Sequence, residues 1–589
     1  MKRSMKKHFS IYPGLIFLAC VLIVIITGCT STQTSGNKID DWEEEVNTNY
    51  TDSVKTGRSR SQVTSTESVP PIVVQPTKPE INTAISRYQS DTIGFSAGGA
   101  KDIMNFRENI RNDYLPLPTD ITYEGLFYDY YFDTGESEMC NELFCPAYSY
   151  ALTDDPFSGK QEYYLSVGLN SGMKESDFKR KKLNLVIVLD ISGSMKSPFD
   201  VYYYDNFGNR QQIPAEEANT EKIEIATESI VALLDHLNED DLFGMVLFNN
   251  NARIAKPLNP VEITDMDAIK DHILEITAHG GTHLSAGMEI ATGLFEELTH
   301  VNLNEYENRI IFLTDAMPNI GETSSTGLLG MTEDNAGNRI HTTFIGIGLD
   351  FNTELVEHIT KIRGANYYSV HSAEQFRERM NDEFEYMVTP LVFDLQLTLE
   401  SDDWKIEEVY GSPEADEVTG ELMKVNTLFP SKKKNDETRG GIILLKLTKT
   451  GDDNSLSLVA SYEDRNGKEH QNEVSVELDE VDRDFFENRG IRKGILLSRY
   501  ADLLINWMID EREHAHYSHP WEPRIDEETG ICIPPRLNQW ERQSLPLTVA
   551  EPYGKLFGLF YTYYDEEIEN IGDDDLQQEL DILDILKIW

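Results

Sequence analysis

The chain has 589 residues, of which 102 are Asp or Glu and 52 are Lys or Arg, so its formal net charge at pH 7 is -50. This excess of negative charge repels phosphate backbones and anionic headgroups. It therefore excludes a general affinity for nucleic acid or for an anionic membrane surface. The length predicts about two to four domains.

The first 28 residues have the pattern of a secretory signal peptide. Basic residues near the N-terminus precede an apolar stretch over residues 15–26. This stretch ends in Ile26-Thr27-Gly28-Cys29, which resembles a bacterial lipobox, whose cysteine is lipidated and becomes the mature N-terminus. We expect an extracytoplasmic protein of the cell envelope or surface, anchored to the membrane through a lipid on Cys29. An uncleaved transmembrane anchor is the alternative.

Residues 29–90 predict a disordered tether. They are rich in Ser, Thr, Asn and Pro and have little apolar periodicity, so they lack the apolar surface needed to form a core. Such a tether would hold the folded part of the chain away from the membrane.

Residues 91–182 predict a small β-rich domain. The aromatic residues 123–132 and the apolar residues 162–169 have compositions that favour strands. Residues 94–98 match the Gly-x-Ser-x-Gly pattern of hydrolases. No buried strand is predicted immediately before them, however, so we do not expect a catalytic serine there.

Three cysteines follow Cys29 in the chain. In an oxidising compartment we expect Cys140 and Cys145 to form a disulfide that closes a tight loop, leaving Cys532 free or able to exchange into that pair. A zinc site built from cysteines alone would need a fourth ligand.

Residues 183–389 alternate between apolar strands and amphipathic helices. This alternation predicts an α/β domain with a doubly wound, mostly parallel sheet and helices on both faces. The expected strands are 183–189, 243–248, 310–313, 343–347 and 367–370, and the expected helices are 221–237, 265–276, 284–298, 352–362 and 373–387.

Oxygen-bearing side chains follow the strands of this predicted sheet. Asp190, Ser192 and Ser194 come directly after the first strand, Thr282 follows two glycines, and Asp315 follows the strand at 310–313. Ligands of such sheets bind at the carboxyl ends of the strands. The five residues together resemble the metal-ion-dependent adhesion site of von Willebrand factor type A (vWA) domains, which have a Rossmann-like fold, and the N-terminal region resembles that of bacterial vWA lipoproteins.

The resemblance implies a role for each of these residues. Ser192, Ser194 and Thr282 would bind Mg²⁺ directly, with Mn²⁺ or Ca²⁺ possible, and Asp190 and Asp315 would hold metal-bound waters. A carboxylate from a partner would fill the remaining position. The chain departs from the family in having an additional loop between Ser197 and Thr220 that contains three consecutive tyrosines, which we expect at the rim of the site.

Two further regions follow the predicted sheet. Residues 390–480 alternate as in an antiparallel β domain, with a type I′ hairpin turn at Asn466-Gly467. Residues 481–589 predict a C-terminal helical region with an apolar stripe and an acidic final helix. After the apolar stripe, three histidines offer an alternative metal site that we do not favour; they are His514, His516 and His519.

These patterns predict a binding protein rather than an enzyme. Asp190 and Asp315 are committed to the metal's waters, and no second general base is evident. We expect Mg²⁺-dependent adhesion to a protein or to an extracellular-matrix-like ligand. The alternatives are an envelope assembly or stress factor that uses the same site transiently and, as a less favoured reading, a metal-dependent hydrolase.

Overall fold

The computed structural model describes residues 38–43, 92–101, 103–135, 141–197, 202–204, 210–212, 220–296, 298, 302–315, 327–347, 358, 361–370, 380–381, 383–413, 420–478, 483–518, 524–525, 532–533 and 545–588. In this part of the chain no helix is long and apolar enough to cross a lipid bilayer. The expected signal peptide and Cys29 lie outside the described residues.

The centre of the chain forms a seven-stranded sheet in the order β12-β11-β8-β13-β14-β15-β2. All neighbours pair in parallel except β11 and β12, so the predicted mostly parallel sheet is confirmed. The sequence patterns did not indicate the two edge strands. The strands are β2 (Gly99–Ala100), β8 (Lys182–Asp190), β11 (Leu242–Phe248), β12 (Ala252–Pro260), β13 (Tyr306–Thr314), β14 (Ile340–Ile347) and β15 (Asn366–Val370).

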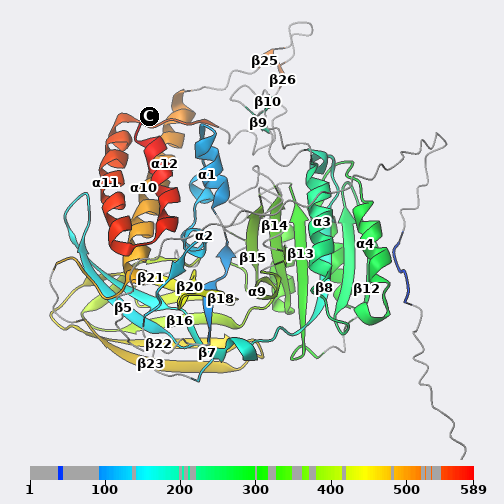
Figure 1. Cartoon of the computed structure of the whole chain (residues 1–589), viewed down its shortest axis with the longest axis horizontal. Helices are drawn as coiled ribbons and strands as arrows, with labels where there is room; N and C mark the ends of the chain where they lie inside the picture. Colours follow the sequence, from blue (N-terminus) through cyan, green and yellow to red (C-terminus); the bar gives the residue numbers. More distant parts are fainter. Residues whose placement is uncertain are drawn as a thin grey trace, which may run out of the picture.

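Helices cover both faces of this sheet (Figure 1). On one face Leu185, Ile187 and Leu189 of β8 join a core with α3 (Lys222–Leu234) and α4 (Met266–Leu274). On the other face the intervening residues Val186 and Val188 join a core with α5 (Leu284–Glu296) and α6 (Leu328–Gly337). Because β8 is buried on both faces, its sequence is a continuous apolar run rather than an alternating one.

Two antiparallel sheets form a sandwich beside this unit, in the orders β23-β22-β16-β18-β1-β7 and β17-β21-β6-β5-β24. The first contains β1 (Thr92–Ala97), β7 (Asn170–Lys174), β16 (Val392–Glu400), β18 (Leu422–Ser431), β22 (Ser455–Asp464) and β23 (Glu469–Glu477). The second contains β5 (Ala147–Asp154), β6 (Gln161–Gly168), β17 (Trp404–Tyr410), β21 (Ile442–Lys449) and β24 (Phe485–Phe486).

The sequence patterns predicted two separate β-rich domains, at residues 91–182 and residues 390–480. In the structure the two segments form one sandwich instead. Strand β1 pairs with β18 and β6 pairs with β21, so each segment supplies strands to both sheets. The apolar residues that face each other between the sheets also come from both segments. Neither segment closes a core alone, because each sheet contains strands of both segments and the apolar residues between the sheets come from both.

The aromatic residues 123–132 form a helix and a short strand instead of the expected β structure. Helix α2 (Tyr123–Tyr128) begins after Thr122, whose hydroxyl accepts a hydrogen bond from the Gly125 amide at 3.1 Å. Only Tyr131–Phe132 forms a strand, β4. This N-cap stabilises a helical start for the segment. The aromatic residues of the segment suit burial in the helical core that is described in the next paragraph.

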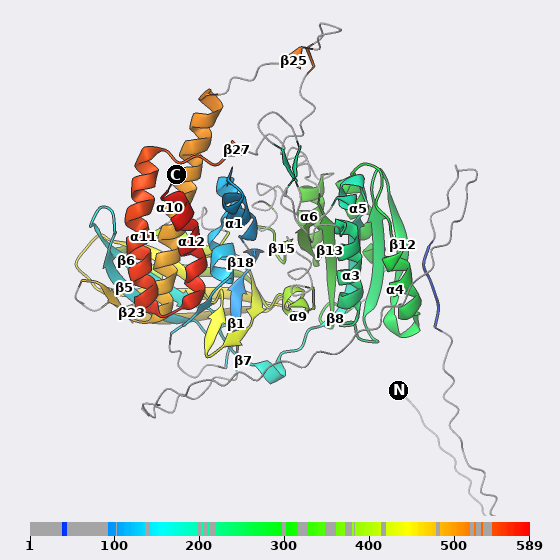
Figure 2. The ribbon, with the colours of Figure 1, turned by 45° about the horizontal axis from the view of Figure 1, so that its top comes forward.

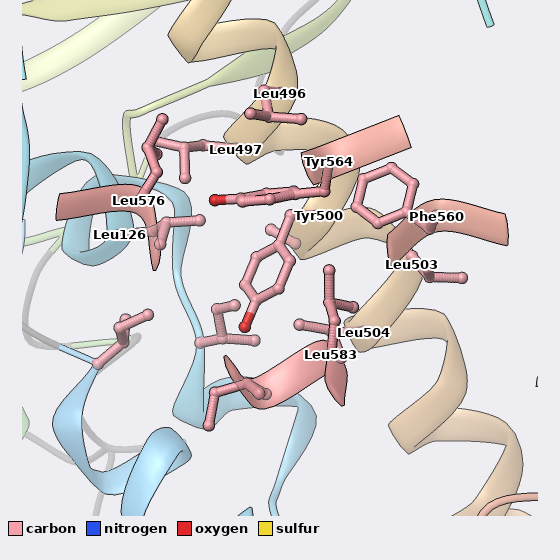
Figure 3. Packing of buried hydrophobic residues seen from close by; sticks show 14 of the residues in the cluster. Leu126, Leu496, Leu497, Tyr500, Leu503, Leu504, Phe560, Tyr564, Leu576 and Leu583 are labelled. Atoms are coloured by element: carbon pink, nitrogen blue, oxygen red, sulfur yellow. The ribbon is translucent and has the colours of Figure 1, made fainter. Parts of the chain in front are cut away.

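A helical layer covers the outer face of the second sheet. It contains α1 (Met104–Arg111), α10 (Arg489–Ser518), α11 (Glu551–Ile571) and α12 (Gln577–Leu586). Figure 3 shows Tyr500 of α10 and Tyr564 of α11 among leucines from these helices, and the predicted apolar stripe of α10 is buried there. Figures 1 and 2 show this layer beside the parallel sheet. The predicted acidic C-terminal helix is α12, preceded by a 3-10 turn at Asp574–Leu576.

The shorter helices and strands are α9 (Phe384–Met387), β3 (Tyr114–Leu115), β9 (Tyr202–Tyr204), β10 (Arg210–Gln212), β19 (Lys433–Lys434), β20 (Glu437–Arg439), β25 (Arg524–Ile525), β26 (Cys532–Ile533) and β27 (Leu545–Pro546). Short 3-10 helices lie at Pro118–Asp120, Glu175–Asp177, Gly193–Lys196 and Val261–Ile263. Cys145 is disulfide-bonded. Its predicted partner Cys140 lies outside the described residues, so the pairing itself stays a prediction.

Residues 38–43, which we call the strap, make defined contacts with the parallel sheet, although the sequence predicted that they belong to a disordered tether. The Ile39 amide donates to the Ile263 carbonyl, and the Glu43 amide donates to the Ala255 carbonyl, so the strap runs along edge strand β12. Asp41 contacts the fully buried ammonium group of Lys256 at 3.0 Å. An edge strand offers unpaired backbone groups, and these contacts explain why a polar segment is held there.

We predict that Asp41→Ala lowers the free energy of unfolding by about 1–3 kcal/mol, because it leaves a buried ammonium group without its carboxylate. Urea denaturation measures this loss. The matched control is Asp40→Ala in the same strap, whose partly exposed pair with His272 contributes less than about 1 kcal/mol. Equal stability of the parent and Asp41→Ala would show that the strap is not held in solution.

Candidate functional site

The candidate site lies where β8 and β13 end side by side. The two strands pair in parallel up to Leu189 and Leu313, so the residues that follow them meet at one end of the sheet. Asp190 and Ser192 are almost fully buried, and Asp315 is 7% exposed. Ser194 lies at the surface. The sequence therefore places two carboxylates under a polar surface that is open to solvent.

Hydrogen bonds join four of the five predicted residues. The hydroxyl oxygens of Ser192 and Ser194 are 2.9 Å apart, and the Ser194 hydroxyl donates to Asp315 Oδ1 at 2.8 Å. Asp190 accepts from the Ser192 amide at 2.8 Å and from the Thr314 hydroxyl at 2.7 Å. The two carboxylates are thus linked through a short row of hydroxyls.

The loop that carries Thr282, the fifth residue, packs against the loop after β8. The Gly193 amide donates to the Gly280 carbonyl at 2.9 Å, and the His279 amide donates to the Ile191 carbonyl. Thr282 is exposed, and its hydroxyl makes no hydrogen bond to another described residue. These backbone contacts bring the second loop to the same face while leaving an oxygen ligand uncommitted.

The two carboxylates perturb each other. Burial raises the pKa of Asp190 to about 7, and the neighbouring charge of Asp315 adds to the effect. Asp315 in turn receives a buried cation, because Lys222 Nζ lies 3.0 Å from its Oδ2. One carboxylate is therefore neutralised by the protein itself, whereas Asp190 has no comparable countercharge among the residues that the structure describes.

Lys222 is a residue that the sequence analysis missed. It opens α3, where a positive charge opposes the helix dipole. A lysine in the first turn of this amphipathic helix, directly after the additional loop, was the available signal.

His279 and His283 were also missed. Both are exposed and flank Thr282 in the second loop, with His279 Nδ1 3.2 Å from the Thr277 carbonyl oxygen. Their exposure and their place in the loop that carries Thr282 make them candidates for contact with a partner.

The donor set fits a hard cation. Hydroxyl and carboxylate oxygens suit Mg²⁺, Mn²⁺ or Ca²⁺, whereas zinc sites favour His and Cys. Among the described residues no group of three or more His, Cys, Asp and Glu side chains could hold a metal ion, and this site contains only two carboxylates. His514 and His516 belong to α10 instead of following it; their side chains and His519 lie outside the described residues.

The additional loop after Ser194 begins and ends next to the site. The Ser197 amide donates to the Ser194 carbonyl, and the Lys222 amide donates to the Ser197 carbonyl at 3.0 Å. Within the loop, β9 pairs with β10 as an antiparallel hairpin, which was not expected. The tyrosine side chains lie outside the described residues, so their contribution to partner binding stays a prediction.

Comparisons with known proteins agree with this fold. The sequence model of the von Willebrand factor type A domain family matches residues 185–318. Inter-alpha-trypsin inhibitor heavy chain H4 of Homo sapiens is 24% identical over 229 residues, which are 38% of this chain and 22% of that protein. YfbK, an uncharacterized protein of Escherichia coli (strain K12), is 22% identical over 301 residues, which are 50% of this chain and 47% of that protein.

Solved structures resemble the chain at low sequence identity. A von Willebrand factor type A protein from Catenulispora acidiphila is 14% identical with a TM-score of 0.38, and the match covers 72% of this chain and 96% of that chain. The ArnB paralog VWA2 from Sulfolobus acidocaldarius is 14% identical with a TM-score of 0.35, covering 76% and 98%. The chain spans less than half the length of the two curated relatives described above.

We predict that Gly280→Ala destabilises the protein by about 1 kcal/mol or more, because Gly280 has a φ of +87° that side chains with a Cβ rarely adopt. The matched control is Gly293→Ala in α5, where a Cβ would meet open space and the better helix propensity of alanine should raise stability. Urea denaturation separates the two. A neutral Gly280→Ala would show that this loop relaxes freely.

Proposed function

We propose that the chain is a lipid-anchored extracytoplasmic protein that binds a carboxylate of a protein or matrix partner through a Mg²⁺-dependent vWA site. The metal residues would be Asp190, Ser192, Ser194, Thr282 and Asp315. The observation that carries the proposal is the row of hydroxyls between two buried carboxylates, open to solvent at Ser194.

Charge supports this role. Asp190 and Asp315 together carry two negative charges when ionised, and Lys222 offsets one of them. A bound divalent cation would give the open face a local positive charge that attracts a partner's carboxylate. The hydroxyls of Ser192, Ser194 and Thr282 would ligate it, and the buried carboxylates would orient its waters.

We also propose that the site is not catalytic. Both carboxylates accept hydrogen bonds from neighbouring groups, Asp190 from Thr314 and Asp315 from Ser194 and Lys222. Asp315 held this way is a poor general base, because taking a proton would weaken its bonds to Ser194 and Lys222, and Asp190 is buried beneath the open surface.

The strap supports an orientation for the anchored protein. Asp190 lies beside Phe248, the last residue of β11, which pairs with Ala252 at the start of β12. Ile39 of the strap contacts Ile263, which lies just beyond Pro260 at the opposite end of β12. Cys29 precedes Lys38 by nine residues, a span of about 30 Å when extended. A lipid on Cys29 would therefore hold that opposite end near the membrane and turn the metal face outward.

We predict that the full chain in detergent binds one Mn²⁺ or Mg²⁺, measured by calorimetric titration, and that the double variant Asp190→Ala, Ser192→Ala does not. The reason is that the variant removes one of the two site carboxylates and one direct ligand. The control is Asp267→Ala on the exposed surface of α4. Undiminished metal binding by the double variant would refute the assignment.

The same proteins test the function. The parent and Asp267→Ala should capture a partner from envelope extract, and EDTA or the double variant should abolish the capture. Capture that is insensitive to EDTA would overturn a metal-dependent contact. Metal-dependent turnover of a peptide or ester by the parent, absent in the double variant, would instead support the hydrolase alternative.

We predict that mass spectrometry of the mature protein finds an acylated Cys29 at its N-terminus. Cys29→Ser should shift the protein from the membrane fraction to the soluble fraction, because a stable anchor needs more than one acyl chain and the variant carries none. Recovery of an intact N-terminal Met1 would contradict this prediction.

A further inference from the structure

A polar pocket of about 290 Å³ lies at the end of the parallel sheet opposite the candidate metal site. Tyr306 and Glu307 at the start of β13, and His341 near the start of β14, line it from the sheet. Phe393 of β16 and Arg465 after β22 line it from the sandwich. The pocket therefore joins the two halves of the fold.

The pocket is rich in cations although the chain as a whole carries a net charge of -50. Its lining contains four positively charged side chains, namely Lys181, Arg339, Arg363 and Arg465, and two carboxylates, Glu307 and Glu463. A cluster of positive side chains on a strongly negative protein raises the local concentration of anions.

Both carboxylates of the pocket already have partners. Glu463 pairs with Arg363 at 2.5 Å. Glu307 accepts from His341 Nδ1 at 2.6 Å and lies 3.4 Å from Arg309 Nη2. These contacts leave Lys181, Arg339 and Arg465 without an ion pair to any described residue.

Two of these three cations are held without a carboxylate at considerable cost. Lys181 is 8% exposed, and its ammonium donates to the carbonyls of Leu303 at 2.9 Å and Arg465 at 3.0 Å. Arg465 donates to the Lys179 carbonyl at 3.0 Å. Burial lowers the pKa of both side chains. Charged groups removed from water are normally paired. These two cations line the pocket with carbonyl partners and with Glu307 and Asp464 as nearby negative charges, so an anion bound there would stabilise them.

Arg339 adds an independent observation. It has a φ of +58°, a left-handed conformation that glycine adopts without strain and a side chain resists. Its guanidinium lies against Gly467 of the β22–β23 hairpin, where a Cβ would approach Nη2 to 2.8 Å. Arg339 follows the C-cap of α6, and from there its guanidinium reaches the pocket beside Gly467.

The hairpin itself differs from the sequence expectation. Only Gly467 has a positive φ, whereas a type I′ turn requires one at Asn466 as well. The Asp464 amide donates to the Lys468 carbonyl, and the Gly467 amide donates to the Asp464 carbonyl. The turn is therefore longer than the expected two residues, and Arg465 within it lines the pocket.

We propose that this pocket binds a small anion with two or more negative charges, of the phosphate or sulfate type. Its volume is near the lower end of small-molecule sites, which suits a compact anion or a small molecule that carries one. Guanidinium groups match the geometry of such oxyanions. Because lining residues come from both halves of the fold, occupancy would bind the parallel-sheet unit to the sandwich.

The test is titration of the full chain in detergent with inorganic phosphate and with sulfate, without divalent metal and at ionic strength matched with NaCl. Calorimetry should show saturable binding in the millimolar range or tighter. Thermal unfolding should shift upward as anion concentration rises, because a ligand of the folded state stabilises it.

Two variants distinguish a binding role from a structural one. Arg465→Gln should weaken phosphate binding by about tenfold, as expected for the loss of a charge-assisted hydrogen bond. Arg339→Gly should weaken it similarly while raising stability in anion-free buffer, because glycine relieves the positive φ. The matched control is Arg483→Gln, whose side chain is 70% exposed and pairs with Asp154, and it should behave as the parent.

Several outcomes would overturn the proposal. They are the absence of saturable binding of either anion to the parent, unchanged affinity in Arg465→Gln and Arg339→Gly, or a loss of stability in anion-free Arg339→Gly. The double variant Asp190→Ala, Ser192→Ala should keep full phosphate affinity. If it does not, the anion binds at the metal face instead, and the pocket proposal fails independently of the proposed function.

Discussion

The parallel pairing of β8 with β13 brings Asp190 and Asp315 to one end of the sheet. The residues at that end must therefore accommodate two buried carboxylates. Buried charges persist only with hydrogen bonds or countercharges. Thr314, Ser192 and Ser194 supply hydrogen bonds, and Lys222 supplies a countercharge to one carboxylate. The other carboxylate, Asp190, lies buried beneath the open polar surface at Ser194, and this arrangement supports the proposed cation site.

The two ends of the parallel sheet differ in charge. The carboxyl ends of β8 and β13 carry the two acids, whereas the opposite end, at the starts of β13 and β14, adjoins a pocket with four cations in its lining. The sandwich contacts the sheet at that cationic end through Arg465. A partner at one end and an anion at the other would therefore act on separate surfaces of one rigid sheet.

The sandwich and the strap show how distant segments complete the fold. Strand β1 pairs with β18 across the whole parallel-sheet unit, so the unit lies within a loop of the sandwich chain. Strand β2, two residues after β1, joins the edge of the parallel sheet. The strap covers the other edge and pairs Asp41 with Lys256. Segments that precede β8 in the sequence therefore contribute to both sides of the sheet: β2 forms one edge, and the strap lies along the other.

Local patterns in the sequence predicted five strands of the parallel sheet and the helices α3, α4 and α5, but not α6 or the two edge strands. The expected helices 352–362 and 373–387 lie mostly outside the described residues. The apolar run before Asp190 predicts a strand buried on both faces, and the stripe through Ile491 and Tyr500 predicts the buried face of α10, because both signals depend only on near neighbours. The same logic predicted that Asp190 and Asp315 follow the ends of buried strands, whereas their grouping into one site came from the resemblance to the vWA adhesion site. Motif spacing was therefore informative for the candidate site.

Only the tertiary structure decided the interactions between distant residues. The pairing of β1 with β18, the contact of Lys222 with Asp315, and the docking of residues 38–43 on β12 each depend on three-dimensional neighbours. The aromatic residues 123–132 became a helix because the Thr122 cap and a buried core outweighed their strand preference. Periodicity and composition indicate which face of a segment can be buried. Which other segment covers that face depends on the packing of the whole chain.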